Sequence, residues 1–262
     1  MSRYSQVLSN KSGQYLLISS FPARMAYGMI SLSIFFMVQQ STGSIAIAGL
    51  ATGVNGITGA TTAGLRGTLI DRFGMKIPLR FFAPSYALLI LLFSTGSSKA
   101  ELVIFAAVLG FSAPPINLSI RPLWKVTVPA NQIRTAYAID TAAMNSVGVF
   151  GPLIATTVSL NYSPQASLQI CSLLIFIGGV SLSLSPQLKT WKPERKSSSD
   201  LAVWRTPAMQ LLMFEGVFIG LGWGAFDIAV PAFTTLEGIP HRTGIIFAIM
   251  AAGNVVGGLV AG

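Results

Sequence analysis

The chain has 262 residues, of which 52% are hydrophobic and 10% are charged, and its formal net charge is +9. Soluble domains carry about 25% charged residues, so this chain holds too little charge to coat a water-facing globule of its length. A single cysteine, expected to be a small core residue, and a single histidine exclude a disulfide framework and a cluster of metal ligands.

Apolar runs dominate the sequence, and a helix that spans a membrane needs about 20 such residues. Eight runs qualify, at about 15–40, 44–66, 79–97, 101–124, 133–160, 164–187, 206–232 and 243–262. The polar segment before the first run, and that run's length, are not those of a cleavable signal peptide. The sequence therefore predicts an all-α fold, a polytopic transmembrane helical bundle that has the lipid bilayer as its surroundings.

The basic residues are distributed unevenly between the two sides of the predicted membrane. If the N-terminus is cytoplasmic, that side receives Arg3, Lys11, Arg66, Arg72, Lys76, Arg80, Arg121, Lys125, Arg134, Lys189, Lys192, Arg195, Lys196 and Arg205. The other side receives Lys99 and Arg242. Cytoplasmic loops carry an excess of lysine and arginine, so we expect a multi-pass cell-membrane protein with a cytoplasmic N-terminus. The bias explains the net charge without a nucleic-acid partner.

The first predicted span contains Arg24 near its middle, one turn from Gly28. A central arginine costs about 2.5–3.5 kcal/mol on insertion scales and normally faces a protein interior or a cavity. Arg24 is therefore a candidate residue of a substrate or proton site.

The second span leads into Gly67-Thr-Leu-Ile-Asp-Arg-Phe-Gly-Met-Lys, a tight charged connection before the third span. It resembles the loop signature of the major facilitator superfamily, G-x-L-a-D-r-x-G-r-k-x-x-l. The positions on pattern are Gly67, Leu69, Asp71, Arg72, Gly74, Lys76 and Leu79, whereas Ile70 and Met75 depart from it.

The resemblance implies a role for Gly67, Asp71, Arg72, Gly74 and Lys76 as a conformational latch. The Asp71 carboxylate would face the N-terminus of a helix in the other half of the transporter and hold the outward-open state, because helix N-termini attract anions. The alternative is generic surface charge that anchors a tight turn.

The fourth and fifth spans carry two charges that could form an ion pair. Arg121 lies near the cytoplasmic end of the fourth span, in a partial match to a second family signature, and Asp140 lies about two turns into the fifth. Arg121 either snorkels to the lipid headgroups or pairs with Asp140, because an intramembrane carboxylate is normally paired or functional.

The fifth span also contains Gly151-Pro152, a partial match to the antiporter signature g-x-x-x-G-P-x-x-G-G. Glycine and proline at this depth allow close helix packing and a bend. The partial match favours export over uptake.

A polar stretch, Gln187–Arg205, follows the sixth span and suits a solvated linker. We therefore expect a six-helix N-terminal bundle at 1–187, a cytoplasmic linker at 188–205 and a partial C-terminal bundle of two helices at 206–262.

The seventh span contains Gly216, Gly220 and Gly224, which recur every four residues and form one smooth stripe on a closely packed or cavity-facing side. Gly220 and Gly224 are candidate residues of helix packing or of a bend. Asp227 falls on almost the same azimuth, and Glu215 lies one residue before the stripe. Proton coupling needs a carboxylate in a low-dielectric site that can exchange a proton. The acids that could take part in proton coupling by their position are Asp227, Glu215 and Asp140. For each of them the alternative is a structural ion pair.

A repeat in the glycine spacing relates the two halves. Gly49 and Gly67 are separated by the same interval as Gly244 and Gly262, and parallel repeats are expected of this superfamily. Gly262 then aligns with the first glycine of the loop signature. We expect the chain to stop where the second copy would begin, with about four further helices missing as its partners.

The family resemblance implies secondary transport by alternating access, with a site near the midplane between the halves. The favoured function is export of a small organic or drug-like solute against inward proton flow. The alternatives are proton-coupled nutrient uptake and a non-transporting fragment that associates with other membrane helices. No enzymatic activity, cofactor or phosphate loop of an ATP-driven pump is expected.

Overall fold

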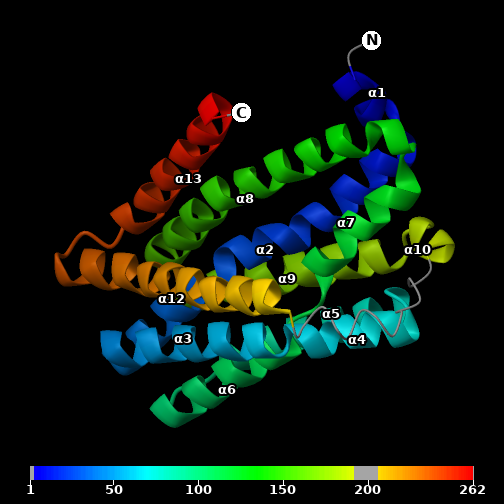
Figure 1. The fold of residues 1–262 in the computed structure, drawn as a ribbon. Coiled ribbons are helices and arrows are strands. Elements are labelled where there is room, and N and C mark those ends of the chain that lie inside the picture. Colours follow the sequence, from blue (N-terminus) through cyan, green and yellow to red (C-terminus); the bar gives the residue numbers. More distant parts are fainter. Residues whose placement is uncertain (1–2, 192–205, 262) are drawn as a thin grey trace.

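The computed structural model describes residues 3–191 and 206–261, and this described part contains helices and no strand (Figure 1). The elements are α1 (Arg3–Ser9), α2 (Lys11–Thr42), α3 (Ile45–Thr61), α4 (Ala63–Phe73), α5 (Lys76–Phe93), α6 (Lys99–Ser112), α7 (Ile116–Thr127), the 3₁₀ turn η1 (Ala130–Gln132), α8 (Ile133–Asn161), α9 (Pro164–Ser183), α10 (Gln187–Thr190), α12 (Pro207–Leu236) and α13 (Arg242–Ala261). The all-α prediction is confirmed.

Each predicted span corresponds to one helix or to a pair of consecutive helices. Within the described residues, six stretches are long and apolar enough to cross a membrane: Lys11–Thr42, Lys76–Phe93, Lys99–Thr127, Ala130–Asn161, Pro164–Ser183 and Pro207–Leu236. These stretches make the chain a multi-pass membrane protein.

Two spans are broken where the sequence predicted continuous helices. The second span divides at Thr62 into α3 and α4, and the fourth divides at Ala113-Pro114-Pro115 into α6 and α7. Proline lacks a backbone N–H and clashes with the preceding turn, so the adjacent prolines end α6 before α7 begins.

The longest helix, α2, has well-defined ends. The Asn10 side chain accepts hydrogen bonds from the backbone N–H groups of Ser12 and Gly13, as expected of an N-cap residue. At the other end Gly43 has φ 65°, a left-handed conformation that glycine adopts without steric cost. α2 packs against α3, α8 and α9 and is the central helix of the bundle.

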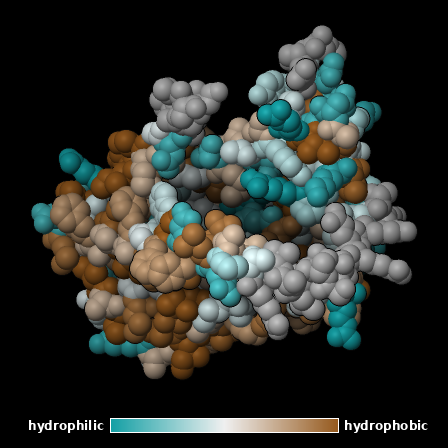
Figure 2. All heavy atoms as spheres, in the orientation of Figure 1, coloured by the Kyte–Doolittle hydropathy of each residue, from teal (hydrophilic) through white to brown (hydrophobic). Residues whose placement is uncertain are grey.

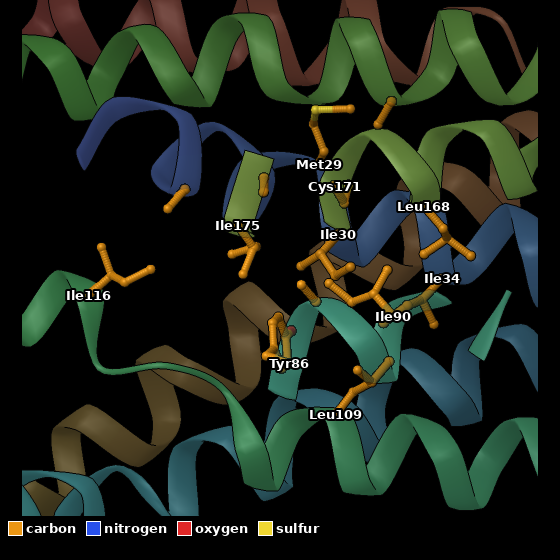
Figure 3. Packing of buried hydrophobic residues seen from close by; sticks show 14 of the residues in the cluster. Met29, Ile30, Ile34, Tyr86, Ile90, Leu109, Ile116, Leu168, Cys171 and Ile175 are labelled. Atoms are coloured by element: carbon orange, nitrogen blue, oxygen red, sulfur yellow. The ribbon is translucent and has the colours of Figure 1, made fainter. Parts of the chain in front are cut away.

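The core lies where α2, α5 and α9 meet. Figure 3 shows Ile30 and Ile34 of α2 close to Ile90 of α5 and Leu168 of α9. The helix backbones approach closely at glycines, since a Cβ at Gly178 of α9 would lie 2.5 Å from the Ala23 nitrogen of α2. Small residues at such crossings stabilise membrane bundles because packing, rather than water exclusion, drives helix association there.

The last two helices pack against the outside of this bundle. α12 lies along α3, and α13 lies along α8 (Figure 1). The hydroxyls of Thr234 and Thr243 are 2.6 Å apart and hydrogen-bonded, which joins the end of α12 to the start of α13. The first residues of the predicted linker belong to α10. Residues 192–205 of that linker lie outside the described residues.

Apolar side chains cover much of the visible surface. Figure 2 shows hydrophobic residues gathered over the part of the molecule where α3, α6 and α12 lie, and hydrophilic residues gathered toward the end with α1. On α12 the exposed large side chains include Leu211, Phe214 and Phe218. An apolar surface of this extent marks contact with lipid or with other helices.

Candidate functional site

A groove of about 900 Å³ runs between α3 and α12, and Ser31 of α2 also lines it. Pockets that bind small molecules typically measure about 300–1,000 Å³ and are mostly apolar. Its apolar lining includes Ile57 and Ala60 of α3, and Val217 and Leu221 of α12. The groove therefore has the size and character of a small-molecule site.

The glycine stripe of α12 faces this groove. Gly216, Gly220 and Gly224 all line it, and a Cβ at any of the three would meet no atom within 4 Å. Sequence analysis allowed either a helix contact or a cavity on this side of α12. Among the described residues no atom packs against Gly220 or Gly224, so their packing role stays a prediction and the structure places them on the groove.

At one end of the groove α3 and α12 touch. A Cβ at Gly49 would lie 3.0 Å from Cγ2 of Ile228, and a Cβ at Gly53 would lie 3.5 Å from its Cδ1. The groove extends away from this contact toward Thr61 and Met213. Two glycines of α3 thus accept one side chain of α12 and bring the two helices together beside Asp227.

Asp227 is half-buried and is the one charged residue among those that line the groove. It has no ion-pair or hydrogen-bond partner among the described residues. The nearby hydroxyl of Thr52 and the amide of Asn55 donate instead to the carbonyls of Ala48 and Ala106, at 2.9 and 3.0 Å. Asp227 is therefore a carboxylate that faces a mostly apolar groove without a cation of its own.

Arg24 and Asp140 form a buried ion pair between α2 and α8. Nη1 of Arg24 donates to Oδ1 of Asp140 at 2.7 Å, and the two side chains are 3% and 4% exposed. Nε of Arg24 is buried without a partner. Neither residue lines the groove. Removing one charge of such a pair leaves the other buried and uncompensated, which costs several kcal/mol.

Of the two alternatives for Arg121, pairing with Asp140 is therefore wrong, because Arg24 occupies that carboxylate. Arg121 is exposed on α7, and its guanidinium lies 6.0 Å from the ring centroid of Tyr137. Arg24 reaches Asp140 because α2 crosses α8 at this level. Glu215, the third candidate acid, is exposed on α12 and does not line the groove.

Gly151-Pro152 lies in α8 between two neighbouring helices. A Cβ at Gly151 would lie 2.8 Å from the backbone of Gly28 in α2, and a Cβ at Gly244 of α13 would lie 2.8 Å from the Pro152 carbonyl oxygen. Gly151 thus permits the close approach of α2 on one face of α8, and Gly244 permits that of α13 on the other.

The stretch from Gly67 is helical as far as Phe73, so the tight connection is confined to Gly74 and Met75. Gly74 has φ 74°, and its N–H donates to the Ile70 carbonyl at 2.8 Å. Glycine is needed there because other residues rarely adopt positive φ. Asp71 and Arg72 are exposed on the last turn of α4, and Lys76 begins α5. Gly67 faces open space.

Two residues that were not among the predicted site residues donate hydrogen bonds to backbone carbonyls at the helix breaks. Arg66 is 9% exposed, and its guanidinium donates to the carbonyls of Gly59 and, at 2.9 Å, Ala113. The hydroxyl of Tyr27 donates to the Pro114 carbonyl at 2.5 Å. Arg66 was considered only as a surface charge. The sequence signal for its role is Pro114-Pro115, because a proline break leaves carbonyls that need donors.

Two comparisons with known proteins bear on this arrangement. The family model described as Major Facilitator Superfamily matches residues 16–262. A protein of Sinorhizobium fredii, described as an uncharacterised MFS-type transporter, is 26% identical over a match that covers 94% of this chain and 65% of the relative. The chain thus spans about 65% of the length of that relative.

Proposed function

The chain belongs to the major facilitator superfamily of transporters, and from this we propose that it acts in secondary active transport of a small organic solute by alternating access. The observation that carries the proposal is the groove between α3 and α12, where Asp227 faces a mostly apolar space of about 900 Å³. In such transporters one set of helices rocks against another around a fixed site. During this motion α3 and α12 would move apart at the contact of Gly49 and Gly53 with Ile228.

Proton coupling is the second element of the proposal. The candidates that take up the proton are Asp140, in its pair with Arg24, and Asp227, in the groove. Protonation of Asp140 would neutralise its charge and release the Arg24 guanidinium, so that one proton changes the contact between α2 and α8. Glu215 is the least suited of the three acids because it is exposed outside the groove.

Export against inward proton flow is the proposed direction, and the partial antiporter signature at Gly151-Pro152 supports it. Uptake by proton symport is the alternative with the same machinery. Association with other membrane helices, without transport by this chain alone, is favoured by the exposed apolar side chains of α12, such as Phe214 and Phe218. The proposed location is the cell membrane, with the N-terminus in the cytoplasm.

The end of α4 supplies the proposed latch, with Gly67, Asp71, Arg72, Gly74 and Lys76 as its residues. Asp71 is exposed there, where a helix N-terminus from another part of the transporter can reach it. Asp71→Asn should lower the transport rate at unchanged membrane abundance. If Asp71→Asn and the wild type transport at equal rates when equally abundant in the membrane, the latch proposal is wrong.

Inside-out vesicles from cells that make the protein test the function directly. Respiration acidifies their interior, and acridine orange reports the proton gradient while ethidium, chloramphenicol or benzoate is added. Proton-coupled export predicts that at least one solute dissipates the gradient, and that Asp140→Asn abolishes the effect. Solute accumulation in right-side-out vesicles with an inward proton gradient would indicate symport instead. Absence of a response in both preparations would contradict transport by this chain.

A further inference from the structure

The groove between α3 and α12 has a strongly asymmetric charge. Of the residues that line it, Asp227 carries a negative charge, and no lysine, arginine or histidine is present among them. Its other polar side-chain groups belong to Ser31, Thr52, Asn55, Thr61 and the indole N–H of Trp223. The hydroxyls of Thr52 and Thr61 donate to carbonyls of their own helix at 2.9 Å. The groove therefore presents one acceptor charge and few free donors.

A carboxylate in such surroundings favours one class of ligand. An anion would be repelled by Asp227. A neutral apolar solute would displace water from the groove and leave the carboxylate without a partner, and burying an unpaired charge is costly. A cation with an apolar body satisfies both properties, because its charge pairs with Asp227 and its body contacts the apolar walls. The indole of Trp223, which also lines the groove, adds an aromatic surface that attracts cations.

We propose that the groove between α3 and α12 binds a lipophilic monocation, with Asp227 as the residue that selects its charge. The glycine stripe gives the cation its room, because Gly216, Gly220 and Gly224 have open space where side chains would otherwise project. This inference rests on the proposed transport function, since it names the substrate class of the same site. Arg24 and Asp140 are not part of the cation site, because they neutralise each other away from the groove.

The test measures binding of radiolabelled tetraphenylphosphonium to the purified chain in nanodiscs, corrected for empty nanodiscs. Asp227→Asn should weaken binding by about tenfold or more, because a charge-assisted contact is lost, whereas Asp227→Glu should keep most of the affinity. The matched control is Glu237→Gln, which removes one negative charge from the exposed end of the same helix and should leave binding unchanged.

A second probe separates charge from apolar character. Tetraphenylborate has nearly the same shape as tetraphenylphosphonium and the opposite charge, so labelled tetraphenylborate, measured in a separate sample, should not bind to the groove. The proposal is overturned if wild-type protein does not bind tetraphenylphosphonium, if Asp227→Asn binds it as well as wild type, or if tetraphenylborate alone binds the protein as strongly as tetraphenylphosphonium does.

If Asp227→Asn does not fold, the variant Gly220→Val tests the same binding site. A Cβ at Gly220 would meet no atom within 4 Å, so this variant should fold while its side chain narrows the groove. Loss of tetraphenylphosphonium binding in Gly220→Val supports the site, and unchanged binding overturns it. Binding without flux of any solute would contradict the transport function alone. Proton-driven flux of chloramphenicol or benzoate without cation binding would contradict the cation site alone.

Discussion

At the scale of single residues, two aspartates differ in whether a cation lies next to them. Asp140 has the Arg24 guanidinium at 2.7 Å and is removed from the groove. Asp227 has no partner among the described residues and faces the groove. The proposals above therefore give the two aspartates different tasks, with Asp140 as a candidate for proton coupling and Asp227 as the candidate for cation recognition.

The Arg24–Asp140 pair should respond asymmetrically to mutation. Asp140→Asn leaves the buried arginine without a countercharge, so we expect a loss of about 3–5 kcal/mol in unfolding free energy. The double variant Arg24→Met with Asp140→Asn removes both charges and should recover much of that loss. Unfolding of the purified protein in mixed detergent micelles measures both. A double variant as unstable as the sum of the two single variants would argue against the pair.

At the scale of helices, α8 is the element on which the two parts of the chain converge. Gly28 of α2 approaches one face of Gly151-Pro152 and Gly244 of α13 approaches the other. α3 and α12 form the second meeting point, through Gly49, Gly53 and Ile228. Small residues permit both crossings, so the side chains at these positions determine how closely the helices approach.

Glycine substitutions should separate a packed crossing from an open groove. At Gly151 an alanine Cβ would lie 2.8 Å from the Gly28 backbone, and overpacking of this kind costs about 1–3 kcal/mol. At Gly216 the space is open, and alanine should stabilise α12 by up to about 1 kcal/mol through helix propensity. Thermal unfolding of Gly151→Ala and Gly216→Ala measures the contrast. Two equal shifts in Tm would contradict the crossing described for α2 and α8.

The two helix breaks depend on Arg66, which donates to carbonyls at the ends of both α3 and α6. Arg66→Met should leave the half-buried Ala113 carbonyl without its donor, at a cost of about 1–3 kcal/mol, whereas the Gly59 carbonyl keeps the Thr62 hydroxyl as a donor. Faster amide hydrogen exchange at the start of α7 should accompany the loss. Arg80→Met, which removes an exposed arginine from α5, is the matched control. Exchange rates unchanged by Arg66→Met would show that the breaks need no such donor.

At the scale of the whole molecule, the surface divides into an apolar region and a polar end, which Figure 2 displays. The basic residues lie mainly in connections that follow the even-numbered predicted spans, and this bias predicts a cytoplasmic N-terminus. The orientation sets the direction in which a proton gradient would act on Asp140 and Asp227. It can be measured without any knowledge of the solute.

Cysteine labelling tests that orientation against a silent background, because Cys171 is fully buried. Ser97, between α5 and α6, and Asn131, between α7 and α8, are both exposed. In whole cells a membrane-impermeant maleimide should label Ser97→Cys, and it should label Asn131→Cys only after permeabilisation. The reverse pattern would invert the topology.

The sequence predicted where the helices lie because apolar length determines which segments can cross a bilayer, but it missed the breaks at Thr62 and at Pro114-Pro115. The azimuth of Asp227 followed from helical periodicity, since residues three and four apart share a face. The partner of Asp140 could not be predicted, because the choice between Arg24 and Arg121 depends on how α2 crosses α8. The role of Arg66 was missed because it needs the ends of two separate helices to be placed side by side.

The central claim is that solute moves through the groove between α3 and α12, and blocking that groove tests it most directly. We would measure proton-driven flux in inside-out vesicles carrying Gly220→Cys, before and after complete reaction with N-ethylmaleimide. The account predicts that flux falls to the level of vesicles without the protein. The same treatment of Gly64→Cys, whose Cβ also faces open space but on α4 outside the groove, should leave flux unchanged. Undiminished flux in fully alkylated Gly220→Cys would contradict the groove as the transport path.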